Sequence, residues 1–185
     1  ETTGLDELTA ELVGIAFSWK KGTGYYLPFP EDRTACKTKL TYFAPFFQSP
    51  EIEKVGHNLK YDIKVLQQYS MNVQAPLFDT MIAHYLINPD MRHNMDVLAE
   101  NYLGYQPQPI TELIGKKGPN QGSMRNVPLD KQTEYAVEDA DVTHQLKNHF
   151  VAEMVSKELI DLLNKIELPL VNVLADMESA GIHID

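Results

Sequence analysis

The sequence has little cysteine, few basic side chains and no long hydrophobic run, and each shortage excludes a class of protein. Cys36 is the single cysteine, so an internal disulfide and a multi-cysteine zinc site are both excluded. No stretch of about 18 consecutive apolar residues is present, so we expect no transmembrane helix. The start, Glu1 to Asp6, is polar and acidic, unlike a signal peptide. We therefore expect a cytoplasmic protein with no membrane contact and no disulfide partner.

Basic residues are outnumbered, because 16 Lys and Arg face 26 Asp and Glu and the formal net charge is −10. Proteins that coat duplex DNA are usually basic, so this acidity argues against extensive binding of the phosphate backbone. It does not argue against a small site that holds a few nucleotides through metal ions. Such a site needs an excess of carboxylates.

The order of the predicted elements indicates the fold class. With 185 residues, the chain is one domain of ordinary size or a domain with a short extension. Strand-like segments at residues 11–19 and 25–30 come first, and short β segments at residues 54–58 and 75–78 lie between helices. We predict an α/β fold with a mixed sheet flanked by helices. Two strands cannot organise so many helices alone, so we expect a central first strand that is truncated just before Glu1.

The remaining segments are predicted from helical periodicity and from turn residues. Helices are expected over residues 34–47, from Asp62 to Tyr69, from Asp79 to Asn88, and over residues 95–103, 129–150 and 151–178. Asp79 and Asp130 are expected to cap the helices that follow them. Gly104 is expected to end the fourth of these helices, and Pro169 to kink or break the last. Residues 105–127 are predicted to form a long loop with a short helical turn at residues 111–114; a loop of this length is more often functional than idle.

For two of these predicted helices, the spacing of side chains indicates which residues share one face. Met81, Ile82, Tyr85 and Leu86 are predicted to face the core from the third helix. Tyr135 and Asp139 are four residues apart and share one helix face. A phenol beside a carboxylate can hold a water and a hard cation together, although such a pair alone is more typical of a solvated helix. The spacings of His84 to His93 and of His144 to His149 do not fit a zinc motif, so structural roles are expected for these histidines.

Other carboxylates have equally ordinary interpretations when taken singly. An Asp at a helix start, such as Asp62, is usually a cap, and Asn58 is more typical of a turn. Hydrolysis of a phosphodiester without a protein nucleophile, however, requires carboxylates from several elements around two divalent metals. A nearby Tyr can orient the attacking water or help to remove its proton.

Several segments, in order and spacing, resemble the bacterial family A DNA polymerases (the DNA polymerase I family). Residues 55–62, VGHNLKYD, resemble the second exonuclease motif of that family, and residues 135–143, YAVEDADVT, resemble the third in its tyrosine form. Residues 1–5, ETTGL, resemble the tail of the first motif. Residues 78–81 and 95–99 are also similar to this family between the motifs, and residues 166–170 and 177–185 resemble the entry to the polymerase domain.

The resemblance implies a ribonuclease-H-like 3′–5′ exonuclease domain that removes mismatched 3′ nucleotides as proofreading during replication and repair. By position, Glu1, Asp62 and Asp139 match the metal ligands. Tyr135 matches the residue that positions the attacking water. The implied cofactors are two divalent ions, Mg²⁺ or, in its place, Mn²⁺ or Zn²⁺. The implied domains are residues 1–150 for the exonuclease and residues 151–185 for a helical continuation into the polymerase.

The resemblance also implies a partner, the single-stranded 3′ end of DNA in the nucleoid of a bacterial cytoplasm. Leu5 matches an apolar residue that packs on the terminal base, and Asn58 and Lys60 match residues near the sugar-phosphate. His57, Tyr61 and the stretch around Ile110 lie where family members contact single-stranded DNA.

The sequence departs from the family at its first residue. The first motif of the family has an Asp two residues before the position of Glu1, and the chain starts after that position. We therefore expect a fragment of a larger polymerase, with weak occupancy by two metals and little exonuclease activity. Two alternatives are a ribonuclease-D-like or RecQ-associated exonuclease, which lacks the segment after residue 166, and a degenerate exonuclease-like scaffold. The presence of Asp62, Tyr135 and Asp139 argues against degeneration.

Overall fold

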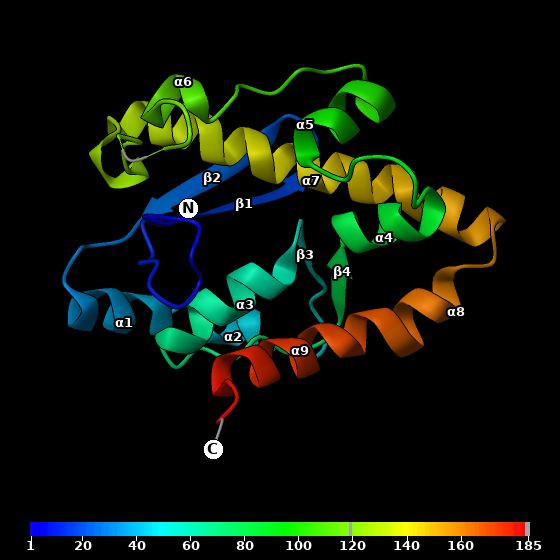
Figure 1. Ribbon diagram of the computed structural model, residues 1–185, viewed down its shortest axis with the longest axis horizontal. Coiled ribbons are helices and arrows are strands. Elements are labelled where there is room, and N and C mark those ends of the chain that lie inside the picture. Colours follow the sequence, from blue (N-terminus) through cyan, green and yellow to red (C-terminus); the bar gives the residue numbers. More distant parts are fainter. Residues whose placement is uncertain (119, 184–185) are drawn as a thin grey trace.

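Two small sheets form the β part of the protein (Figure 1). The computed structural model describes residues 1–118 and 120–183. Strand β1 (Gly14–Lys20) pairs antiparallel with β2 (Thr23–Pro28), and β3 (Lys54–Gly56) pairs parallel with β4 (Leu77–Asp79). The predicted strands are therefore present, with ends shifted by up to three residues. Antiparallel and parallel pairs both occur, as the predicted mixed α/β fold requires, but they lie in separate sheets.

Helix α7 (Leu129–Ser156) is the longest element and contacts both sheets. It packs on β1 and β2 and also touches β3, and Figure 1 shows it running across them. Its buried residues recur at helical spacing, namely Gln132, Ala136, Val142, Thr143, Leu146, Phe150 and Met154. The prediction that Asp130 caps this helix is wrong. Pro128 holds the N-cap position, and Asp130 lies in the first turn, where its charge favours the positive end of the helix dipole.

The chain reverses after α7 and returns beneath the sheets as a chain of helical segments. Glu158 adopts a left-handed backbone conformation (φ 58°) at this reversal, which the sequence did not predict. The returning segments are α8 (Ile160–Leu162), a π-helix η3 (Leu163–Glu167) and α9 (Leu168–Ala180). The irregularity expected at Pro169 lies directly before it, where residues 163–167 form the π-helix. Pro169 itself lies in the first turn of α9, a position that proline tolerates well.

The other helices are short; some connect the strands and the rest lie between β4 and α7. The segment expected as one helix over residues 34–47 divides into two helices, and Pro45 lies in the first turn of the second. These helices are α1 (Arg33–Thr41), α2 (Ala44–Phe47), α3 (Leu59–Gln68), α4 (Thr80–Ile87), α5 (Met95–Leu98) and α6 (Thr111–Ile114), with a π-helix η1 (Ala99–Leu103) and a 3₁₀ turn η2 (Met124–Asn126). Gly104 ends η1 with a left-handed φ of 62°, as predicted. Within the described part of the chain, no helix is long and apolar enough to cross a membrane.

The predicted core face of α4 is only partly correct, because Ile82 and Leu86 pack against the core but Tyr85 does not. The buried residues of this helix are Thr80, Ala83, His84 and Ile87, whereas Tyr85 is 52% exposed. The buried face is more polar than the sequence suggested because His84 has hydrogen-bond partners inside the core. Its Nδ1 lies 2.7 Å from His93 Nδ1, and its Nε2 lies 3.0 Å from the Tyr102 hydroxyl. A buried polar side chain with partners on both nitrogens costs little, so the side that carries it can pack inward.

Candidate active site

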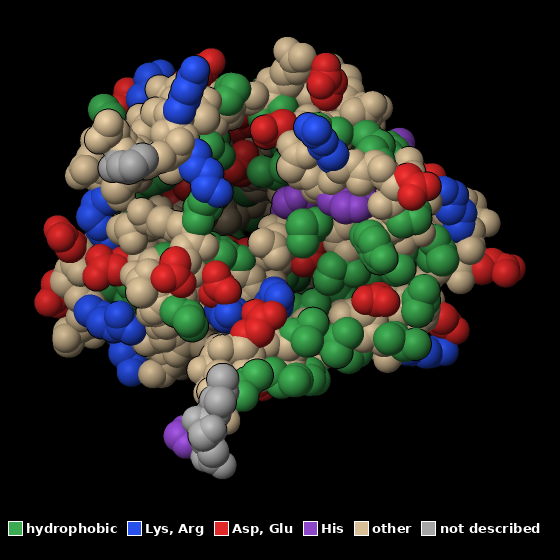
Figure 2. Space-filling model, in the orientation of Figure 1, with side chains coloured by type: hydrophobic (Ala, Val, Ile, Leu, Met, Phe, Trp, Pro, Cys, Tyr) green, Lys and Arg blue, Asp and Glu red, His purple; other side chains and the backbone are tan. Residues whose placement is uncertain are grey.

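A cavity of about 440 Å³ lies between β1, β3, α3 and α7. Figure 2 shows it as a hollow near the centre of this face, with acidic side chains inside. Glu1, Asp62 and Asp139 line the same cavity. They come from the N-terminal segment, from α3 and from α7, so the fold brings together three carboxylates that are far apart in the sequence.

The turn from β3 into α3 places Asp62. Asn58 holds the N-cap position of α3 with a left-handed φ of 64°, a conformation that Asn tolerates better than most residues. Leu59 begins the helix, so Asp62 lies in its first turn and does not open the helix as the sequence suggested. The capping interpretation of Asp62 is therefore excluded, and its side chain is available to the cavity.

Asp79 supplies the capping carboxylate, and for two helices at once. It is 1% exposed and accepts from the backbone N–H of Met81 and Ile82 at the start of α4, as predicted. It also accepts from the N–H of Asn58 (3.2 Å) and Leu59 (2.7 Å) at the start of α3. The sequence did not reveal this second role, because nothing in a local pattern couples Asp79 to a helix 20 residues earlier. Asp79 thus fixes the turn that presents Asp62.

The carboxylates of the cavity influence one another. Burial raises the pKa of Asp62 to about 6; the Glu1 α-ammonium opposes this rise, and the charges of Asp79 and Glu1 add to it. Burial and the charge of Glu1 raise the pKa of Asp139 to about 8, against hydrogen bonding with the Tyr135 hydroxyl. The negative charge of Glu1 therefore acts on both aspartates, which destabilises their ionised forms.

Tyr135 belongs to the same electrostatic group. Burial, followed by the charges of Asp139 and Glu1, raises the pKa of its phenol, so the hydroxyl keeps its proton at neutral pH. The ring packs against a small cluster of Val13, Met124 and Val127. Ile110, from the long loop, packs against that cluster too. The loop that the sequence marked as functional thus lies next to the Tyr135 end of the site.

The donor set fits a hard divalent cation. Three carboxylates in one cavity offer the oxygen ligands that Mg²⁺ and Mn²⁺ prefer, and a cation would relieve their mutual repulsion. In residues 1–118 and 120–183, however, no three His, Cys, Asp or Glu side chains are grouped closely enough to form a finished metal site. The carboxylates share the cavity without converging on one point.

One of the candidate DNA-binding residues lines this cavity, and the others lie on neighbouring segments of the chain. His57 lines it, and its Nδ1 lies 2.9 Å from the Thr80 hydroxyl. Leu5 is 69% exposed on the N-terminal loop. The Tyr61 hydroxyl donates to the Gly4 carbonyl and is hydrogen-bonded with Thr2, so Tyr61 also connects α3 to the segment that carries Glu1.

The last two candidates make contacts within the protein. The Asn58 N–H donates to Asp79, as described above, and the Lys60 ammonium lies 2.6 Å from Glu178 of α9. The structure therefore brings Glu1, His57, Asp62 and Asp139 to one cavity and Tyr135 beside it. It places Leu5 and Tyr61 on the N-terminal segment or in contact with it, and directs Lys60 toward α9.

Comparison with known proteins decides the family. Residues 1–155 match the sequence profile of a family described as 3′-5′ exonuclease. The chain belongs to this 3′-5′ exonuclease family. Its whole length is 37% identical to the DNA polymerase I of Borreliella burgdorferi over 190 residues and 35% identical to that of Chloroflexus aurantiacus over 191 residues. The predicted family is thereby confirmed. The chain covers 20% of each of these two relatives.

Solved structures confirm the predicted fold. The chain resembles Brucella melitensis NrnC with a TM-score of 0.77 and 20% identity, covering 98% of this chain and 82% of that one. A structure described as the apo form of the nuclease matches with a TM-score of 0.79 and 20% identity over the same shares. At this level of identity the likeness shows the fold, a ribonuclease-H-like exonuclease fold, and no more.

Proposed function

We propose that this exonuclease domain removes nucleotides one at a time from the single-stranded 3′ end of DNA, as the proofreading part of a larger DNA polymerase. One observation carries the proposal. Glu1, Asp62 and Asp139 come from three separate segments, line one cavity and act on one another electrostatically. In this proposal residues 1–150 form the nuclease, and residues 151–185 lead toward the polymerase domain of a protein of the bacterial cytoplasm.

The carboxylates would hold two divalent cations, Mg²⁺ by preference. When bound, such cations supply positive charge to the phosphate and make a water more acidic. The Mg²⁺ named with one solved structure of Brucella melitensis NrnC is consistent with this assignment. The number and identity of the ions in this protein belong to the proposal.

The protein side chains orient the reactants. The Tyr135 hydroxyl keeps its proton, so it is suited to donate a hydrogen bond that orients the attacking water and is not suited to remove its proton. Water attacks the last phosphodiester, and the bond from phosphorus to the 3′ oxygen of the preceding nucleotide breaks. The proton that the water loses passes through solvent to this 3′ oxygen, and a nucleoside 5′-monophosphate leaves. His57 at the cavity, and Leu5 and Tyr61 at the N-terminal segment, would guide the single strand, with Leu5 against the terminal base.

The first test follows a 5′-labelled single-stranded oligonucleotide incubated with the protein and Mg²⁺. We expect slow shortening from the 3′ end in single-nucleotide steps and loss of this shortening in Asp139→Asn, which keeps the shape of the side chain. Asp161→Asn, on the exposed surface of α8, removes one charge elsewhere and is the control.

The same assay on the chain with Asp-Ala added before Glu1 tests the first motif. The resembled family has an Asp two residues before this Glu, so we expect the extended chain to cut faster, by at least tenfold. If neither form releases nucleotides while both are folded, the catalytic proposal is wrong. Binding of the strand without any release would then favour the scaffold alternative.

A further inference from the structure

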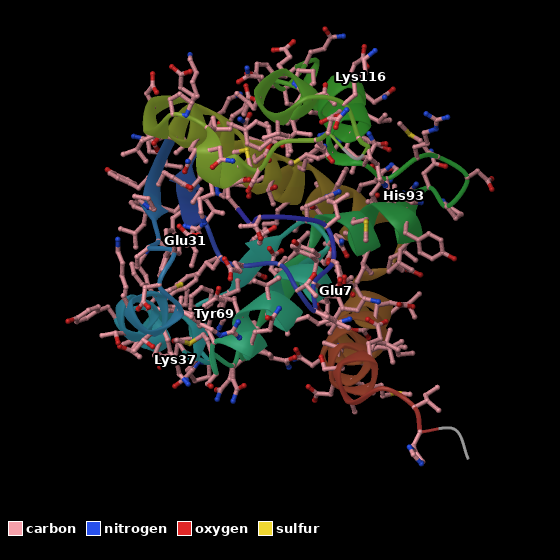
Figure 3. The ribbon with its side chains drawn as sticks, turned by 60° about the vertical axis from the view of Figure 1, so that its left-hand side comes forward. Glu7, Glu31, Lys37, Tyr69, His93 and Lys116 are labelled. Carbon is pink, nitrogen blue, oxygen red and sulfur yellow. The ribbon has the colours of Figure 1, made fainter. Side chains whose placement is uncertain are left out.

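A network of four charges joins α3, α9 and the N-terminal loop. Glu178 of α9 binds two lysines of α3, Lys60 at 2.6 Å and Lys64 at 3.0 Å, one with each carboxylate oxygen. Lys64 also binds Glu7 at 2.6 Å. In Figure 3, Glu7 is labelled on the side of the molecule where α3 and α9 lie next to each other. The two lysines keep the pKa of Glu178 below its usual value, so this carboxylate is ionised at neutral pH.

The two halves of the network differ in strength. The Lys64 side chain is only 3% exposed, and a buried ammonium must keep its carboxylate partners, so Lys64 anchors Glu178. The Lys60 side chain is 34% exposed, and its pair with Glu178 is of the solvent-screened kind that contributes little. Glu178 is therefore held in place whether or not Lys60 binds it, whereas Lys60 can leave.

Lys60 also lies in the same helical turn as two residues that line the cavity. Leu59 and Asp62, its neighbours in the first turn of α3, both line the cavity. Positions 60 and 62 point in roughly opposite directions around a helix, so Lys60 is drawn toward α9 while Asp62 faces the cavity. A contact between Lys60 and a DNA phosphate therefore requires its ammonium to leave Glu178 or to donate to both anions at once.

We propose that Glu178 is a built-in competitor of the DNA strand for Lys60. The carboxylate of α9 occupies the ammonium until a backbone phosphate replaces it, and the anchored negative charge lowers the affinity for the strand. The inference rests on the proposed function, a single DNA strand at the cavity, and on the resemblance that matches Lys60 to a residue near the sugar-phosphate. It makes α9 a regulator of strand binding, because any movement of α9 that withdraws Glu178 frees Lys60.

A double-variant cycle tests this. The affinity of the 185-residue chain for a fluorescein-labelled single-stranded oligothymidine is measured by anisotropy in Ca²⁺, with product analysis to confirm that the strand stays intact. The variants are Glu178→Gln, Lys60→Gln and the double variant. Asp161→Asn is the matched control, because it removes one charge from an exposed pair with Lys165 on another helix.

We expect Glu178→Gln to bind about two- to fivefold more tightly than Asp161→Asn, the range of an exposed ion pair. Lys60→Gln should bind more weakly and lower the slope of log affinity against log salt by about 0.7, as one lost phosphate contact predicts. In the Lys60→Gln background, Glu178→Gln should change affinity no more than the control does. If Glu178 had only a structural role, its replacement would change the melting temperature, but its effect on strand affinity would not depend on Lys60.

Two outcomes overturn the inference while leaving the nuclease proposal intact. In the first, Glu178→Gln binds the strand no more tightly than the control does. In the second, Lys60→Gln binds the strand with unchanged affinity and unchanged salt dependence. The nuclease proposal rests on the carboxylates and is judged by nucleotide release. If no variant binds the strand at all, both this inference and the proposed DNA path are wrong.

Discussion

Replacing Asp79 by Ala should destabilise the protein more than its single side chain suggests. The two oxygens of this buried carboxylate accept four backbone N–H groups that start α3 and α4. The first turn of a helix has no internal acceptors for these donors, so they depend on a side chain. Without Asp79 the donors lie in a region closed to water, and the turn that presents Asp62 loses its support.

The expected loss of stability in Asp79→Ala follows mainly from the two shortest hydrogen bonds. The N–H groups of Leu59 (2.7 Å) and Met81 (2.8 Å) make bonds of full strength, each worth about 1.5–3 kcal/mol when the acceptor is charged. The contacts to Asn58 and Ile82 are longer, at 3.2 and 3.3 Å, and add less. The cost of burying the charge and its repulsion with Asp62 offset part of the sum. We expect the free energy of unfolding to fall by about 3–5 kcal/mol, a large share of the roughly 5–15 kcal/mol that is typical of a folded protein.

Urea unfolding followed by circular dichroism measures this loss. Asp79→Asn is the matched control, because it keeps Oδ1, which accepts from Asn58, Met81 and Ile82, and changes only the atom that faces Leu59. Its cost should be smaller, about 1–3 kcal/mol for one unsatisfied donor. A loss below about 1 kcal/mol in Asp79→Ala would refute the view that one carboxylate holds both helix starts.

Two further predictions concern protons and cations. Burial and His93 lower the pKa of His84 from 6.5 to about 4, so the folded state binds fewer protons than the unfolded state. The stability that this provides is present above pH 6.5 and is lost as the pH falls toward 4. The urea midpoint of the wild type should therefore fall across this range, and it should fall less in His84→Gln. Equal falls in the two proteins would contradict the lowered pKa of His84. Because burial raises the pKa of Asp139 to about 8, a cation competes with a proton for this carboxylate. The rise in melting temperature caused by Mn²⁺ should therefore grow between pH 6.5 and 8.5 and disappear with EDTA; an Asp139→Asn variant that gives the same rise would exclude Asp139 as a ligand.

Local patterns predicted the parts of the fold that local forces determine. Residues 129–150 contain no Gly or Pro and repeat their apolar side chains at helical spacing, and α7 is there. Asp79 caps α4, and Gly104 ends η1, because each of these roles depends on groups within a few residues.

Features that depend on distant segments were missed. The buried face of α4 depends on partners of His84 that lie 9 and 18 residues away. The pairing of Lys60 with Glu178 joins residues 118 apart, and no periodicity encodes it. For the site, the resemblance named Glu1, Asp62 and Asp139, and the structure gathers them in one cavity. The support that Asp79 gives to α3 was not foreseeable, since it arises only when β3 and β4 lie side by side.

The division of the strands into two sheets has a mechanical consequence. Glu1 pairs with the chain just before β1, whereas Asp62 follows β3, and in the described residues no β-ladder joins these two sheets. The spacing between the two carboxylates is therefore set by packing beneath α7 and by side-chain hydrogen bonds, such as those of Tyr61 with Thr2 and Gly4, and not by a β-ladder. Packing of this kind yields to small displacements at a lower cost than breaking a hydrogen-bonded ladder. The position of Glu1 relative to Asp62 thus depends on side chains, so substitutions in this packing should alter the cation site without disturbing either sheet.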